Sequence, residues 1–141
     1  MKTIDRSIDP TADQVRALRD SDVSGPVVMV NMLKFRDRAD YPEDFTGDRD
    51  LSGREAYARY QHAFTVTVGE TSKAEVLYEG PVQQVFIGRE GAAETDWDAM
   101  LIVRYPDKAN FLGMMANEEY RAALVHRYAG LRRTVLLQCG G

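Results

Sequence analysis

Residues 26–35 read PVVMVNMLKF, and this run determines how the rest of the chain must be arranged. One set of alternate side chains comprises Val27, Met29, Asn31, Leu33 and Phe35, and the other comprises Val28, Val30, Met32 and Lys34. Because both sets are largely apolar, the pattern predicts a central strand that is covered on both faces. Asn31 is the polar exception inside the run, and a buried amide without hydrogen-bond partners costs about 1–3 kcal/mol.

The length and charge of the chain limit its organisation and its partners. Its 141 residues fit one domain, which we divide into an N-terminal helical extension (1–25) and a core (26–139) that contains a long charged loop (36–51). Eighteen Lys and Arg residues face 22 Asp and Glu residues, giving a net charge of −4, and no basic run occurs. We therefore expect no nucleic-acid partner.

Hydrophobic runs and cysteines point to a cytoplasmic protein. No apolar run approaches the roughly 20 residues that cross a membrane, and the first residues do not form a hydrophobic leader, so we expect no membrane association. Cys139 is the only cysteine and has no Cys or His at ligand spacing. This excludes a disulfide within the chain and argues against a zinc site, and we expect no metal and no cofactor.

Helix start signals occur at three places. Residues 10–20 form the first candidate, with Asp9 or Thr11 as N-cap and Gln14 three residues after Thr11. The apolar edge of this helix is narrow, so we place it on the outside of the domain. A capping box opens a second helix over residues 52–68, and a third runs from 118 to 129.

The segments between and after these helices contain strands and one long loop. We predict strands at 74–78, at 82–87 as a continuation past Gly80-Pro81, at 97–105 and at 134–139, a short helix after Asp107, and Gly130 as the left-handed residue that ends the last helix. The loop 36–51 is charged, but Tyr41 and Phe45 favour a loop that docks on the body.

The order of core elements is strand, helix, strand, strand, helix, strand. This order predicts an α+β fold, the ferredoxin-like βαββαβ sandwich, in which two helices cover one face of an antiparallel sheet. The strands at 26–35 and 97–105 are nevertheless apolar on both faces. We therefore expect a homodimer that pairs through the uncovered sheet faces.

Several short segments together resemble the domain of unknown function 1330 (DUF1330) family. They are the apolar first strand, the helix with Tyr57 and Tyr60, the Trp97 strand ending in Arg104-Tyr105-Pro106, residues 117–121 (Asn-Glu-Glu-Tyr-Arg) and Arg127. The resemblance covers roughly residues 26–139 and implies the dimeric α/β-barrel superfamily. That superfamily includes cofactor-independent monooxygenases, haem-degrading enzymes, isomerases and proteins that only bind small molecules.

In this architecture a pocket is expected between the sheet and its helices. The catalytic candidates are Asn31 and His126, and the substrate-binding candidates are Tyr57, Tyr60, Trp97, Arg104, Tyr120 and Arg127. Asn31 can orient a carbonyl or a dioxygen-derived anion through its N–H groups, or simply satisfy a backbone group. His126 can act as a base or lie in solvent. Arg104 and Arg127 can clamp a carboxylate, or Arg104 can pair with Glu79 or Asp98.

Three functional hypotheses follow. The leading one is a homodimeric small-molecule-binding protein, with cofactor-independent monooxygenase or isomerase chemistry, and it predicts a pocket of a few hundred Å³ that contains Asn31 and at least one of Tyr60 and His126. The alternative is a non-catalytic structural or interaction protein in which loop 36–51 reaches the partner subunit. The third is a haem-binding or haem-degrading protein, because Asn31, Trp97 and His126 resemble the Asn, Trp and His set of the haem-degrading superfamily members.

Overall fold

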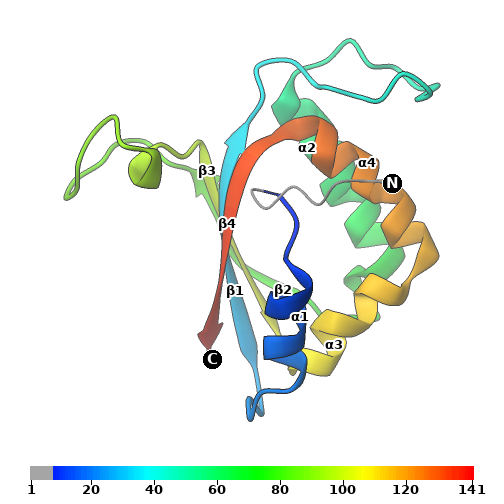
Figure 1. The fold of residues 1–141 in the computed structure, drawn as a ribbon, viewed down its shortest axis with the longest axis vertical. Coiled ribbons are helices and arrows are strands. Elements are labelled where there is room, and N and C mark those ends of the chain that lie inside the picture. Colours follow the sequence, from blue (N-terminus) through cyan, green and yellow to red (C-terminus); the bar gives the residue numbers. More distant parts are fainter. Residues whose placement is uncertain (1–7) are drawn as a thin grey trace.

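The run PVVMVNMLKF forms the strand β1 (Val27–Phe35), which lies inside a four-stranded antiparallel sheet with the order β2-β3-β1-β4. The computed structural model describes residues 8–141. The other strands are β2 (Glu75–Pro81), β3 (Ala99–Tyr105) and β4 (Leu131–Gly140). Helices α2 (Gly53–Phe64) and α4 (Glu118–Gly130) lie side by side on one face of the sheet (Figure 1). The ferredoxin-like fold is therefore confirmed.

The alternation in the sequence translates directly into burial. In β1 the side chains of Val27, Met29, Leu33 and Phe35 are buried, whereas those between them are only partly buried. Residues of β3 alternate in the same way, from Ala99 to Tyr105. Because opposite residues of an antiparallel pair share a face, the buried set forms the inner face under the helices, and the other set forms an outer face.

Capping side chains fix where the helices begin. Ser52 accepts a hydrogen bond from the backbone of Glu55, and the Glu55 side chain accepts one from the backbone of Ser52, so the predicted capping box is present. Thr11 and Gln14 form the same motif at the start of α1 (Ala12–Arg19). After α2 the chain continues as a π-helix to Gly69, close to the predicted end of that helix.

Gly130 has a different role from the one predicted. Its backbone is not left-handed, and α4 runs through it directly into β4. A Cβ on Gly130 would lie 2.5 Å from the Gly53 oxygen and 2.8 Å from the Tyr57 nitrogen. The glycine is therefore required for the close approach of α4 to α2, since any side chain would force the two helices apart.

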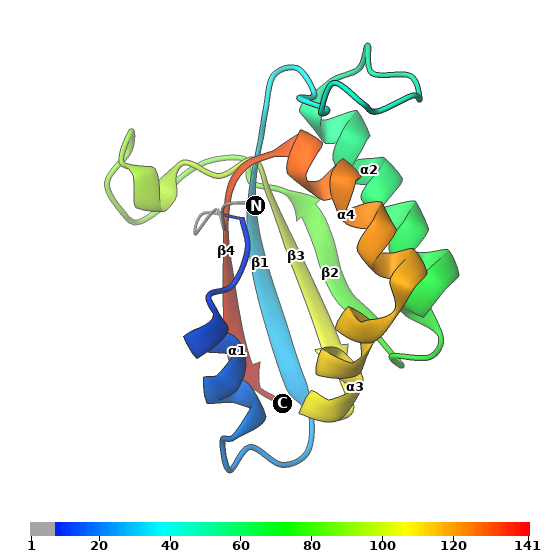
Figure 2. The same cartoon turned by 45° about the vertical axis from the view of Figure 1, so that its right-hand side comes forward.

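The N-terminal helix α1 lies in front of β4, on the same side of the sheet as α2 and α4 (Figures 1 and 2). No residue of α1 itself is buried. Lys108, the first residue of α3 (Lys108–Gly113), donates hydrogen bonds through Nζ to the backbone oxygens of Arg19 (2.8 Å) and Ser21 (2.6 Å). These bonds hold the far end of α1 against α3.

The prediction of a strand over residues 82–87 is wrong. β2 ends at Pro81, and residues 82–98 leave the sheet as a projecting arm that contains a 3₁₀ turn at Ala93–Thr95. Proline has no N–H to donate, and after it only the Val82 nitrogen bonds back, to the Asp98 oxygen at 3.0 Å. The start of β3 accordingly moves to Ala99, two residues after the predicted start at Trp97.

Loop 36–51 docks on the chain's own helices, as its aromatic residues predicted. Tyr41 is buried and stacks on Phe45 with ring centroids 4.1 Å apart. The Asp40 nitrogen donates to the Ala129 oxygen at 2.9 Å, which ties the loop to the end of α4. Tyr41 also packs with Leu51, Ala56 and Ala129 in a small hydrophobic cluster that is separate from the main core.

Candidate functional site

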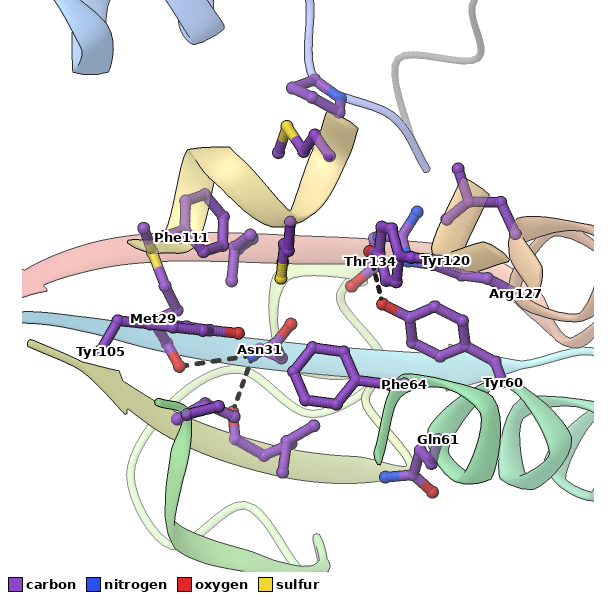
Figure 3. Close-up of a pocket in the computed structure, with 18 of the residues that line it drawn as sticks. Met29, Asn31, Tyr60, Gln61, Phe64, Tyr105, Phe111, Tyr120, Arg127 and Thr134 are labelled. Atoms are coloured by element: carbon purple, nitrogen blue, oxygen red, sulfur yellow. Dashed lines mark hydrogen bonds between the residues drawn. The ribbon is translucent and has the colours of Figure 1, made fainter. Parts of the chain in front are cut away.

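A cavity of about 1420 Å³ lies between the inner face of the sheet and the helices (Figure 3). Its floor comprises residues of β1 and β3, namely Met29, Asn31, Leu101, Val103 and Tyr105, and its walls come from α1, α2, α3 and α4. The cavity is larger than the predicted few hundred Å³, and it contains Asn31 and Tyr60 as predicted. Of the other candidates, Tyr57, Tyr120 and Arg127 also line it.

The edge strands of the sheet do not close the cavity. Val76 on β2 and Leu136 on β4 line the cavity, yet they are 57% and 43% exposed. The cavity is therefore open to solvent along the edge strands. Most of its lining side chains are aliphatic, aromatic or Met, so it favours apolar molecules.

Asn31 lies on the cavity floor with its amide orientation fixed by the sheet. Its Nδ2 donates to the backbone oxygens of Met29 (3.3 Å) and Leu101 (3.1 Å), which uses both amide hydrogens. The side-chain oxygen Oδ1 points the other way, into the cavity (Figure 3), and has no hydrogen-bond partner among residues 8–141. Asn31 therefore presents a hydrogen-bond acceptor to the cavity, and not the N–H donor that the sequence hypothesis assigned to it.

Two tyrosine hydroxyls meet at the wall of the cavity. Tyr60 from α2 and Tyr120 from α4 are both buried, and their hydroxyl oxygens lie 2.9 Å apart in a hydrogen bond. Burial raises the pKa of Tyr120 above its usual value, and the neighbouring Tyr60 adds to this effect. Burial likewise raises the pKa values of Tyr57 and Tyr105. These phenols stay protonated, because the surroundings disfavour a negative charge.

Arg127 reaches the cavity with its charge already engaged. Its Nη1 donates to the Ile8 oxygen at 2.7 Å and lies 3.8 Å from Asp9 Oδ1, with both side chains mostly buried. The guanidinium therefore fixes the segment before α1 against α4. The predicted pairing of Arg127 with Arg104 in a carboxylate clamp is wrong, because Arg104 lies on the outer face, where its Nη1 is 3.9 Å from Glu75 Oε2.

Trp97 and His126 do not line the cavity either. The indole of Trp97 lies at the base of the arm, where Nε1 donates to the Glu94 oxygen at 2.8 Å. His126 lies on the loop side of α4, with Nδ1 2.8 Å from the hydroxyl of Tyr41. Asn31, Trp97 and His126 therefore occupy three separate places, and the set that motivated the haem hypothesis is not assembled.

The neutral form of His126 is favoured where it lies. Partial burial lowers the pKa of His126, and the nearby charge of Arg59 lowers it further. Arg59 Nη1 donates to the Tyr41 hydroxyl at 3.4 Å, which leaves the hydroxyl hydrogen for His126 Nδ1. These contacts among Arg59, Tyr41 and His126 tie loop 36–51 to α2 and α4.

The sequence analysis missed the contribution of the N-terminal segment to the site. Ile8, Val15 and Leu18 line the cavity together with Phe111 and Met114. The signal was present, because Val15 and Leu18 form the narrow apolar edge of α1. That edge covers the open side of the cavity, and α1 is thus part of the site.

Metal-binding groups and membrane-spanning helices also bear on the kind of site. Within residues 8–141, no group of three or more His, Cys, Asp or Glu side chains is placed to hold a metal ion. The helices in the same range are too short or too polar to span a membrane.

Crystal structures of a bacterial protein share this fold over nearly the whole length of both chains. The RPA0582 protein from Rhodopseudomonas palustris, described as a protein of unknown function, is 31% identical with a TM-score of 0.83, and the match covers 95% of each chain. A structure of the methylated RPA0582 protein is 32% identical with a TM-score of 0.83, and the match covers 95% of this chain and 93% of that one. No family model and no curated protein matches the sequence.

Proposed function

The chain belongs to the same family as the RPA0582 protein of Rhodopseudomonas palustris, a protein of unknown function, and we propose that it is a homodimeric protein that binds a small, largely apolar molecule between its sheet and helices. The observation that carries this proposal is the open cavity of about 1420 Å³ with Asn31 on its floor. An apolar cavity with a few convergent polar groups is the usual form of a small-molecule site. We retain membership of the DUF1330 family as part of the proposal.

The outer face of the sheet supports the homodimer. Its side chains are Val28, Val30 and Met32 of β1, Met100 and Ile102 of β3, Val135 and Leu137 of β4, and Tyr78 of β2. Leu137 and Tyr78 are 54% and 49% exposed. A continuous apolar sheet face in water is unfavourable and marks an interface.

Charge pairing indicates that the occupant of the outer face is a second copy. Lys34 lies 3.0 Å from Asp96, and Arg104 lies 3.9 Å from Glu75, so the charges at the ends of this face are paired within the chain. Such a face does not require a partner of opposite charge. It fits a two-fold arrangement in which the same apolar patch meets itself.

Binding explains the cavity better than oxygenase or isomerase chemistry does. Both N–H groups of Asn31 are bonded to the backbone, and His126 is bonded to Tyr41 on the other side of α4. The pure interaction hypothesis expected loop 36–51 to reach a partner, but the loop docks on its own chain. We therefore propose ligand binding as the function of the cavity.

Titration with the neutral dye Nile red, whose fluorescence rises in apolar surroundings, tests the cavity. We expect a saturable signal with one site per chain. Val103→Trp, which fills the cavity floor, weakens binding by about tenfold or more, because the added ring occupies the site. The matched control is Val66→Trp, since Val66 is 66% exposed and does not line the cavity. Equal binding by wild type and a folded Val103→Trp variant would refute the proposal.

A further inference from the structure

We infer that the ligand of the cavity is an uncharged molecule that donates a hydrogen bond, from a hydroxyl or an N–H group, to Oδ1 of Asn31. This inference rests on the proposed function and specifies the ligand. It follows from the direction in which the sheet holds the amide. The backbone oxygens of Met29 and Leu101 can only accept hydrogen bonds, so the NH₂ group must face them and the oxygen must face the cavity.

The bonds on the NH₂ group make this acceptor rigid. Rotation of the amide by half a turn would direct Oδ1 at two backbone oxygens and leave both N–H groups without those partners. The cavity therefore presents an acceptor whatever ligand enters. A ligand that has only acceptors at this position would leave Oδ1 without a partner and place oxygen against oxygen.

The charges around the cavity argue against an anionic ligand. Arg127 is already bonded to the Ile8 oxygen and paired with Asp9. The protonated state of Tyr120, whose pKa is raised by burial, reflects surroundings in which a negative charge is costly. Arg121 also lines the cavity, but it is exposed to solvent. A carboxylate on the cavity floor would therefore lose its hydration without gaining a buried free cation.

The tyrosine pair supplies a second, complementary contact. In the Tyr60–Tyr120 hydrogen bond one hydroxyl donates, which leaves the hydrogen of the other hydroxyl for a further acceptor. The cavity thus offers an acceptor on its floor and a donor on its wall. A phenol, an alcohol or an amide-bearing apolar molecule matches both contacts.

Three probes of nearly the same shape test this inference. They are 1-naphthol, which is neutral and donates a hydrogen bond, 1-methoxynaphthalene, which lacks the donor, and 1-naphthoate, which is anionic at pH 7. We expect wild type to bind 1-naphthol about 3- to 10-fold more tightly than 1-methoxynaphthalene, the range of one net hydrogen bond. We expect 1-naphthoate to bind at least about tenfold more weakly than 1-naphthol. The measurement is isothermal titration calorimetry.

The variant Asn31→Leu tests whether Oδ1 causes the preference for 1-naphthol. In a folded Asn31→Leu protein the preference for 1-naphthol over 1-methoxynaphthalene disappears. If that variant does not fold, the comparison of the three probes in wild type is sufficient to test the inference. Equal or tighter binding of 1-methoxynaphthalene or 1-naphthoate by wild type overturns the inference and leaves the proposed function intact. If neither the probes nor Nile red bind, the proposed function fails as well.

The arm formed by residues 82–98 carries a second inference, which rests on the proposed dimer. Phe86 and Ile87 are 88% and 89% exposed, the highest values among the exposed large apolar residues of the described chain. The arm projects from the sheet on the side away from α2 and α4 (Figure 1). It therefore extends beyond the outer face, which is the face proposed to meet a second copy. We infer that Phe86 and Ile87 pack against the partner subunit in the dimer.

Specific contacts hold the base of the arm in a fixed position. Asp98 Oδ2 accepts from the Phe35 nitrogen at 2.8 Å. Arg133 Nη1 donates to the Ala93 oxygen at 2.8 Å, and its guanidinium lies 4.3 Å from the Trp97 ring centre. These contacts fix the arm to β1 and β4 and hold two apolar side chains in water, where only a partner can bury them.

The double variant Phe86→Ser/Ile87→Ser tests the arm. Both side chains are exposed in the single chain, so the fold should be unaffected. We expect the dimer dissociation constant, measured by sedimentation, to rise about tenfold or more, because two apolar contacts are lost. Val66→Ser is the control and leaves the constant unchanged. An unchanged constant in the double variant overturns this inference alone, whereas a monomeric wild type overturns the proposed dimer.

Discussion

The two faces of the sheet are both apolar, but they are covered in different ways. The inner face meets α2 and α4 and leaves a cavity in which a polar oxygen, that of Asn31, is presented. The outer face has an aliphatic centre, represented by Val30 and Leu137, with its charged residues paired at the ends. No segment of residues 8–141 forms a helical layer over it.

The difference between the two faces shows how much of a fold an alternating sequence pattern can predict. Apolar residues on both sides of a strand require that both sides be removed from water. The pattern does not specify what covers each side. Here one cover belongs to the same chain and leaves room for a ligand, and the other is proposed to be a second copy. The following predictions test what covers each face, in order of decreasing expected effect.

The largest effect is expected from a charge at the centre of the outer face. Leu137→Asp places two carboxylates in the proposed interface, one from each copy, and we expect the dimer dissociation constant to rise by about 100-fold or more. Sedimentation velocity over a concentration series measures this change. Leu137 is 54% exposed in the single chain, so the monomer should remain folded.

Val66→Asp is the matched control for the outer face. Val66 is 66% exposed and lies on the π-helix after α2, far from the outer face in the fold. We expect its dissociation constant to equal that of wild type. If Leu137→Asp and Val66→Asp behave alike, the outer face is not the dimer interface.

The next largest effect is expected where α4 packs against α2 over the inner face. Gly130→Ala places a Cβ 2.5 Å from the Gly53 oxygen, so α4 must move away from α2, and we expect a loss of about 2–3 kcal/mol in the free energy of unfolding. Urea denaturation measures it. The control is Gly113→Ala in α3, where nothing lies within 4 Å of the new Cβ. That variant should be neutral or slightly stabilised, and an equal loss in both variants would contradict the packing argument.

A smaller effect is expected within the inner face. Tyr60→Phe removes one hydroxyl and leaves that of Tyr120 without its buried partner, so we expect a loss of about 1–2 kcal/mol in the free energy of unfolding. The control is Val66→Ala, because Val66 is 66% exposed and lies outside both the cavity lining and the outer face, so its free energy of unfolding should stay close to that of wild type. Similar stability in wild type and Tyr60→Phe would show that the hydroxyl pair does not stabilise the wall.

The smallest effect lies outside both faces, where loop 36–51 meets α4. The pKa of His126 is lowered from its ordinary 6.5 by burial and by Arg59, so the unfolded chain takes up a proton first as the pH falls. The stability that neutral His126 contributes is therefore complete above about pH 6.5 and is lost as the pH falls toward the folded-state pKa. His126→Gln should flatten this part of the pH profile in urea denaturation, whereas the exposed His62, changed to Gln, should leave it unchanged. A pH profile that His126→Gln leaves unchanged would contradict this account of His126.

Much of the fold could be predicted because its signals are local and redundant. Alternation identified β1 and β3, and capping residues such as Thr11 and Ser52 located the helix starts. Each signal depends on the physical chemistry of a few neighbouring residues. The strand predicted at 82–87 failed because apolar residues such as Phe86 and Ile87 are typical of a strand in sequence, although both are exposed on the arm.

The candidate site was harder to predict because it depends on helix phase and on distant segments. His126 and Arg127 are adjacent, but one contacts Tyr41 on the loop side of α4 and the other reaches the cavity. Apolar residues occur on several sides of α4, so its inward direction could not be fixed from periodicity. The amide orientation of Asn31 depends on the Leu101 oxygen, which lies 70 residues away in sequence.

Native mass spectrometry in the presence of 1-naphthol reports on both faces of the sheet in one spectrum. We expect a species with the mass of two 15.9 kDa chains that carries two molecules of 1-naphthol. A single chain with no added mass, at concentrations where the protein stays in solution, would contradict it.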